Sequence, residues 1–117
     1  MSGLLTTHVL DTAGGKPAPG MAVELFVMEG EGRRLLKSVF TNANGRTDEP
    51  LLGEGELAAG LYEIVFDVAG YFSGDLDLPD PPFLGRVLVR FGIADPDSHY
   101  HVPLLASPWS YSTYRGS

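Results

Sequence analysis

Four side chains in this sequence have the chemistry for proton transfer at a carbonyl group: the three histidines, His8, His99 and His101, and one arginine, Arg46. Histidine has an ordinary pKa of about 6.5, which makes it the side chain best placed for general acid–base work near neutrality. Arg46 directly follows an Asn-Gly pair typical of a turn, and its planar fork can stabilise negative charge that develops on an oxygen. A single histidine or arginine is more often an ordinary surface or core side chain. The evidence for a functional site is therefore that the histidines lie on similar faces of the predicted strands.

The spacing of two of the histidines places them on one face of an extended segment. His99 and His101 are two residues apart, and side chains alternate between the two sides of a β-strand. Tyr100, Val102 and Leu104 then point the other way, as an apolar core face would. We therefore expect both imidazoles to lie on the side of this strand that faces away from the core.

The third histidine lies in a segment of the same kind near the start of the chain. Residues 4–10 are β-branched and apolar and are predicted to form a strand. His8 shares its side of this strand with Thr6, whereas Val9 takes the other side. The neighbours of His101 on its own face are similarly polar or small. Faces of this composition favour exposed functional histidines over packed ones.

The rest of the chain alternates short strands with turns rich in glycine and proline. The predicted strands are 4–10, 22–28, 34–41, 61–68, 84–93, a segment from His99 that stops before Ser107-Pro108, and 109–114. The other predicted elements are a loop at 11–20, a hairpin turn at 29–32, a turn-rich loop at 42–48, an eighth strand at an edge near 47–52, and one or two helical turns at 69–76. Many short strands with almost no helix predict an all-β sandwich.

Length and composition bound the class of protein. The 117 residues fit one domain spanning 1–117, and no internal repeat is visible. The absence of cysteine excludes disulfides and cysteine-based zinc sites, and a net charge of −7 argues against nucleic acid as a partner. No apolar run approaches the roughly 18 residues that a membrane helix needs, and no signal peptide or peroxisomal tripeptide is recognisable, so we expect a cytoplasmic protein.

Three motifs carry a resemblance to a known family. They are Leu5-Thr-Thr-His-Val-Leu-Asp11, Asn44-Gly-Arg-Thr-Asp48, and His99-Tyr-His-Val-Pro-Leu-Leu105 together with the ending Tyr114-Arg-Gly-Ser117. In this order, and in a chain of this length, they resemble the 5-hydroxyisourate hydrolases, the transthyretin-related enzymes of purine breakdown. The resemblance covers both ends and the middle of the chain.

The resemblance implies a transthyretin-like, or prealbumin-like, β-sandwich of two four-stranded sheets with one short helix near residues 69–76. It also implies hydrolysis of 5-hydroxyisourate to 2-oxo-4-hydroxy-4-carboxy-5-ureidoimidazoline in urate catabolism, without a cofactor or a metal ion. The family resemblance further implies a homotetramer, a dimer of dimers, with its active sites at the central interface.

Individual roles follow from the same resemblance. His8, Arg46 and His101 match the catalytic residues, and substrate-binding contacts fall to His8, Arg46, Tyr114 and Ser117. His99 matches the motif and is expected to stand behind the site, orienting its neighbour. Which of the two catalytic histidines is the general base is left open by the sequence.

Three other functions compete with this interpretation. A zinc enzyme is possible in principle because His-x-His plus a third histidine is a known ligand set, although no carboxylate stands in a matching register. A non-enzymatic protein that binds a small ligand, as transthyretin carries hormone, would share the same sandwich. A purely adhesive sandwich would not need histidines on these faces.

Overall fold

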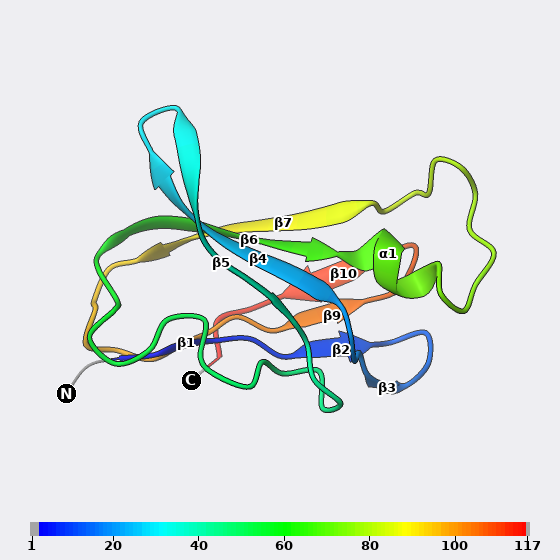
Figure 1. Ribbon diagram of the computed structural model, residues 1–117, viewed down its shortest axis with the longest axis horizontal. Helices are drawn as coiled ribbons and strands as arrows, with labels where there is room; N and C mark the ends of the chain where they lie inside the picture. The colour runs from blue at the N-terminus through cyan, green and yellow to red at the C-terminus, as the bar shows by residue number, and fades with distance from the viewer. Residues whose placement is uncertain (1–2, 117) are drawn as a thin grey trace.

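The computed structural model describes residues 3–116, which form two β-sheets packed face to face and one short helix (Figure 1). The elements are β1 (Leu5–Thr6), β2 (Val9–Asp11), β3 (Lys16–Pro17), β4 (Ala22–Glu29), β5 (Gly32–Phe40), β6 (Gly60–Asp67), α1 (Val68–Phe72), β7 (Arg86–Ile93), β8 (Tyr100–His101), β9 (Leu104–Ala106) and β10 (Tyr111–Thr113). Both sheets have four strands. The sheet with the longer strands, called the larger sheet, has the order β5-β4-β6-β7, and the sheet with the shorter strands, called the smaller sheet, has the order β10-β9-β2-β3. The two-stranded pair β1-β8 continues the smaller sheet and is described with it. The predicted sandwich of two four-stranded sheets is confirmed.

The larger sheet is antiparallel and follows the alternation of its sequence. β4 and β5 form a hairpin, with Gly30 at a φ of +59° in the predicted turn. One face of β4, β6 and β7 is buried against the smaller sheet, which gives these strands their period of two. Its fully or nearly buried side chains are Val23, Leu25, Tyr62, Ile64, Phe66, Val87, Val89 and Ile93.

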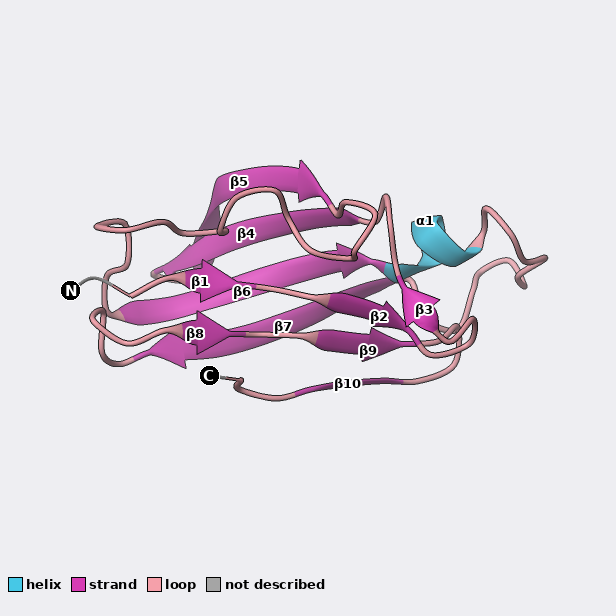
Figure 2. Cartoon of the chain, turned by 90° about the horizontal axis from the view of Figure 1, so that it is seen from below, coloured by secondary structure: helices cyan, strands magenta, loops and turns pink. Residues whose placement is uncertain are grey.

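The smaller sheet brings the two ends of the chain side by side, and it carries the histidines. β1 pairs in parallel with β8, and β2 pairs in parallel with β9. Figure 2 shows β1 and β2 following one another along one line and β8 and β9 along the next. The interruption coincides with Pro103, which has no N–H to contribute to the ladder. Each predicted strand is therefore divided in two while it keeps its direction.

The alternation of side chains along the first of these lines is as predicted. Leu5, Thr7 and Val9 are almost fully buried, and the Thr7 hydroxyl donates to the carbonyl of Val102 at 2.7 Å. Thr6 and His8 are partly buried on the opposite face. The part of the outward face around Thr6 and His8 is therefore polar, and it is free to present functional groups.

Two segments have a different structure from the one the sequence predicts. The fourth strand of the smaller sheet is β3, within the stretch predicted as a loop, and Pro17 is tolerated there because β3 lies at the edge. The strand predicted near 47–52 is wrong: only an isolated bridge joins Leu52 to Leu5, and the Thr47 hydroxyl donates to the carbonyl of Glu49, which bends the segment.

The helix occupies one turn only. α1 begins one residue before the predicted segment and ends well before residue 76. Asp67 caps its N-terminus by accepting a hydrogen bond from the N–H of Gly70 at 3.1 Å. Tyr71 ties the helix to the smaller sheet by donating to the Asp11 carboxylate at 2.8 Å, and burial together with that carboxylate raises the pKa of Tyr71 to about 12. Among residues 3–116, no helix is long and apolar enough to cross a membrane.

Candidate active site

His101 ends β8 on the outward face of the smaller sheet, and its position is fixed from two sides. Its backbone pairs with Thr6 on β1, and its Nδ1 lies 2.8 Å from the Thr6 hydroxyl. On the other side its carbonyl accepts the N–H of Gly116 at 2.7 Å. A Cβ at position 116 would come within 2.8 Å of the imidazole Cδ2, so glycine allows the C-terminal segment to lie directly against the ring.

His8 lies between β1 and β2 and faces the loop that carries Arg46. The two residues form an isolated antiparallel bridge, and the His8 Nε2 lies 2.9 Å from the carbonyl oxygen of Asn44. A carbonyl can only accept, so this contact requires a proton on Nε2 and leaves Nδ1 free in the neutral ring. The bridge brings a residue from the N-terminal segment and one from the middle of the chain to the same place.

The loop reaches His8 because of one glycine. Gly45 has a φ of +74°, and a Cβ there would come within 2.3 Å of the carbonyl oxygen of Val9. The Gly45 carbonyl in turn accepts the N–H of Val9 at 2.8 Å. A side chain at this position would therefore push the Arg46 loop away from the sheet.

The three predicted catalytic residues are electrostatically coupled. The pKa of His101 is lowered below its ordinary value, chiefly by burial of the ring and further by the positive charges of Arg46 and His8. His101 is therefore neutral near pH 7 and able to accept a proton. Within residues 3–116, no carboxylate lies at salt-bridge distance from Arg46, so its charge remains available to a substrate.

Among residues 3–116, no hydrogen bond joins the other predicted site residues to the side chains of this group. The Nδ1 of His99 accepts the N–H of Leu4 at 3.2 Å, and the ring of His101 has Thr6 as its partner. Tyr114 is exposed and lines a cavity of about 240 Å³ between β7 and the C-terminal segment. Ser117 lies outside the described residues.

Two groups at the site were not assigned by the sequence analysis. Thr6 was noted as a neighbour of His8 on the same face, but its pairing with His101 depends on which strands are adjacent. The carbonyl of Asn44 has no sequence signal at all, because every residue has a carbonyl. Only the parallel pairing of the two chain ends and the geometry of the loop reveal these contacts.

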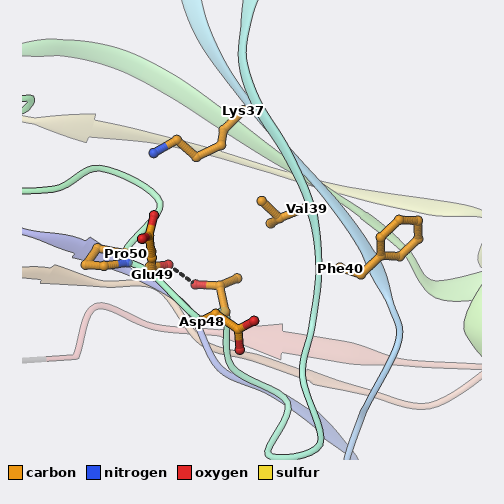
Figure 3. A pocket seen from close by; sticks show the side chains of 7 residues that line it. Lys37, Val39, Phe40, Asp48, Glu49 and Pro50 are labelled. Carbon is orange, nitrogen blue, oxygen red and sulfur yellow. Dashed lines mark hydrogen bonds between the residues drawn. The ribbon is translucent and has the colours of Figure 1, made fainter.

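A second cavity, of about 500 Å³, borders the loop that carries Arg46 (Figure 3). It lies between the end of β5 and the segment 47–50, with Asp48, Glu49 and Pro50 on one side and Val39 and Phe40 on the other. Neither His8 nor His101 lines it. Across residues 3–116, no group of three or more His, Asp or Glu side chains is placed to hold a metal ion.

The fold and the sequence together define the class of protein. Residues 5–116 match the HIUase/Transthyretin family, and the chain belongs to that family.

Some relatives that align with almost the whole of this chain are named as enzymes. The chain is 58% identical to 5-hydroxyisourate hydrolase 2 of Rhizobium meliloti (strain 1021), an alignment that covers 99% of this chain and 98% of that protein. The solved structure of sea bream transthyretin in complex with thyroxine is 30% identical, has a TM-score of 0.84, and is matched over 96% of this chain and 93% of its own. The relatives of this sequence therefore include both a hydrolase and a transthyretin with bound thyroxine.

A third relative is a longer protein. The crystal structure of (S)-allantoin synthase is 47% identical and has a TM-score of 0.92 over 99% of this chain. This chain spans 44% of the length of that protein.

Proposed function

We propose that this protein hydrolyses 5-hydroxyisourate to 2-oxo-4-hydroxy-4-carboxy-5-ureidoimidazoline, a step of urate catabolism. The observation that carries the proposal is the convergence of His8, Arg46 and His101 on the outward face of the smaller sheet, with His101 held neutral by its surroundings. The 58% identity to a 5-hydroxyisourate hydrolase supplies the substrate.

The reaction needs three functions, which these residues provide. His101 accepts a proton from a water molecule, and the water oxygen forms a bond to a ring carbonyl carbon. The carbonyl oxygen becomes negatively charged, and Arg46 stabilises it with its guanidinium. When the oxyanion collapses, the C–N bond breaks, and the ring nitrogen takes a proton from Nδ1 of the second histidine, His8, which enters this step as the imidazolium. The products are the ring-opened acid, a protonated His101 and a neutral His8, and passage of the proton from His101 to His8 through water restores both rings.

The hydrogen bonds of the two rings support this division of roles. His8 Nε2 is committed to the Asn44 carbonyl, so His8 acts through Nδ1. The Thr6 hydroxyl can either donate to His101 or accept from it. In the form that we propose, His101 Nδ1–H donates to Thr6, and Nε2 is the base. The depressed pKa of His101 keeps that nitrogen unprotonated at neutral pH.

The remaining assignments are part of the same proposal. Tyr114 and Ser117 contact the substrate, and His99 stands behind the site, where its bond to the N–H of Leu4 holds the start of β1 against the strand that carries His101. No cofactor or metal ion takes part. A cytoplasmic location remains our prediction.

We also propose that the protein acts as a homotetramer. Arg46 is exposed and the two imidazoles are only partly buried, so in one chain the group lies open on a sheet face. Hydrolysis of a ring carbonyl benefits from a site that is shielded from bulk water. Within residues 3–116, the edge strands β7 and β10 have no paired strand on one side, and such edges are usually covered. Sedimentation equilibrium of the purified protein measures the assembly directly.

The activity is tested by following the ultraviolet decay of freshly generated 5-hydroxyisourate with and without the protein. We expect clear acceleration over the spontaneous rate and a loss of about 10²–10⁴-fold in turnover for His101→Ala, because a general base contributes about that much. The variant should remain folded, since the ring lies on the outward face. Turnover near that of the wild type in His101→Ala contradicts the assignment.

A ligand-binding function is the alternative outcome. Transthyretin of sea bream, in complex with thyroxine, shares this fold. A folded, tetrameric sample that leaves the decay of 5-hydroxyisourate unchanged would favour that function.

A further inference from the structure

The loop that carries Arg46 is organised around one side chain, that of Asn42. The N–H of Asn42 donates to the carbonyl of Arg46 at 2.7 Å, and its carbonyl accepts the N–H of Gly45 at 2.9 Å. Its side-chain oxygen accepts two further backbone N–H groups, those of Asn44 at 2.9 Å and Arg46 at 3.2 Å. One asparagine thus closes the turn twice, once with its backbone and once with its amide.

The other end of the same amide is also bound. The Asn42 Nδ2 donates to the carboxylate of Asp48 at 3.1 Å. Figure 3 shows Asp48 among the side chains that line the 500 Å³ cavity. The amide of Asn42 is therefore held from both sides, and its oxygen points at the backbone of the residues that enter the site.

The loop contributes two groups to the proposed site, and the hydrogen bonds of Asn42 hold the backbone of both. Arg46 brings the guanidinium, and Asn44 brings the carbonyl that accepts from His8. Asn42 contacts the backbone of both residues, but no hydrogen bond joins its side chain to His8 or to His101. Its effect on the site can only be indirect, through the placement of these two groups.

We propose that Asn42 is a positioning residue: its amide fixes the Arg46 guanidinium and the Asn44 carbonyl against the two histidines, with Asp48 holding the amide in place. The inference rests on the proposed hydrolysis of 5-hydroxyisourate. It predicts that loss of the amide impairs the chemical step more than it impairs the fold, because small displacements of an oriented group reduce its effect steeply.

The test compares Asn42→Ala with the exchanged pair N42D/D48N. Asn42→Ala removes both ends of the amide, and we expect kcat to fall by about 10²-fold, with a smaller change in KM. The exchanged pair keeps an acceptor oxygen at 42 and reverses the donor and acceptor between 42 and 48, so it should recover activity to within about tenfold of the wild type. Asp48→Asn alone should give an intermediate loss.

A matched control is available at the helix. The side chain of Asp67, at the end of a strand of the larger sheet, also accepts a hydrogen bond from a nearby backbone N–H, that of Gly70. Asp67→Ala removes a cap of the same kind, so it should lower thermal stability and leave kcat and KM unchanged.

A readout that does not depend on activity is the titration of the imidazoles by NMR. Arg46 contributes to the lowered pKa of His101, together with His8 and with burial of the ring, so displacing the guanidinium should raise that pKa. We expect the His101 pKa in Asn42→Ala to move towards its value in Arg46→Ala, and to return in the exchanged pair. Should Asn42→Ala fail to fold, Asn42→Asp keeps the acceptor oxygen and loses only the donor to Asp48, so its kcat should fall below that of the exchanged pair if Asp48 holds the amide in place.

Two results overturn the inference. One is an Asn42→Ala variant with kcat within about threefold of the wild type and an unchanged His101 titration. The other is a loss of activity in Asn42→Ala that Asp67→Ala reproduces at equal thermal stability. A wild-type protein without hydrolase activity overturns the proposed function instead, and the NMR titration then still decides whether Asn42 places Arg46.

Discussion

Two groups of charged side chains lie on the outward faces of the two sheets, and they are built in opposite ways. On the larger sheet, Glu63 of β6 is bound by Arg33 of β5 and Arg90 of β7. On the smaller sheet, Arg46 lies near His8 and His101 without a carboxylate at salt-bridge distance among residues 3–116.

In the group on the larger sheet, the charges of Glu63, Arg33 and Arg90 are paired with one another. Glu63 is 2% exposed, and one of its oxygens accepts two bonds from Arg90, at 3.1 and 3.2 Å, while Arg33 donates to the other. A second contact places the Arg33 guanidinium 3.9 Å from the ring centre of Phe26. Both carboxylate oxygens are taken, so this group has little left to offer a ligand.

The second group leaves positive charge unmatched, in a chain whose formal net charge is −7. A local field can oppose the sign of the whole protein and attract an anionic or carbonyl-rich substrate. The two faces differ in whether their charges already have partners, and not in the number of charges. We therefore infer that unpartnered charge marks the face that we propose as functional.

After His101→Ala, the largest effect that separates the two groups should follow from Arg46→Ala. We expect kcat to fall by about 10²–10³-fold, since the oxyanion loses its main donor, while stability changes little because the side chain is exposed. Loss of the positive charge also raises the pKa of His101, so the acidic limb of the pH–rate profile should move to higher pH.

The control for this change is Arg34→Ala, which removes an exposed arginine bound to Glu29 at the tip of the β4–β5 hairpin. Its kcat and its pH profile should match those of the wild type. Equal losses in the two variants would mean that the effect of Arg46 is one of general charge.

The opposite result is expected for Glu63→Gln. This change leaves two guanidinium groups without their anion, so the free energy of unfolding should fall by about 2 kcal/mol, while kcat and KM stay as in the wild type. Urea denaturation and the decay assay on the same sample measure both quantities. A loss of activity at unchanged stability would erase the distinction between the two faces.

The sequence predicted most of the fold because alternation is a local property. The core side of β6 and β7 follows from a period of two, and so does the outward direction of His8 and His101. The burial of Glu63 was not predictable, because the sequence places it on the outward face with Asp67. Its two arginines come from strands that lie far away in the chain.

The residues of the proposed site can be selected from the sequence, but their contacts cannot. His8, Arg46 and His101 stand out by their types and motifs, and their roles stay a prediction. Thr6 as the partner of His101, and the amide of Asn42 as the centre of the loop, depend on which segments lie together. The edge strand β3 was missed for a related reason, because a two-residue pairing has no period to detect.

The smallest effect should be a pH dependence of the free energy of unfolding that comes from His101 on the smaller sheet. The pKa of His101 is lower in the folded protein than the ordinary value of about 6.5, so the unfolded chain binds the proton more tightly. The contribution to stability is therefore present above pH 6.5 or so and is lost as the pH falls through the folded pKa. Urea midpoints of the wild type and of His101→Gln should converge as the pH falls through this window.

The measurement that tests the account most directly is the decay of freshly generated 5-hydroxyisourate with equal amounts of wild type, His101→Ala and Glu63→Gln. We predict strong acceleration by the wild type, the same turnover for Glu63→Gln, and about 10²–10⁴-fold less for His101→Ala. If His101→Ala retains wild-type turnover, or if the loss appears in Glu63→Gln instead, the outward face of the smaller sheet is not the active site.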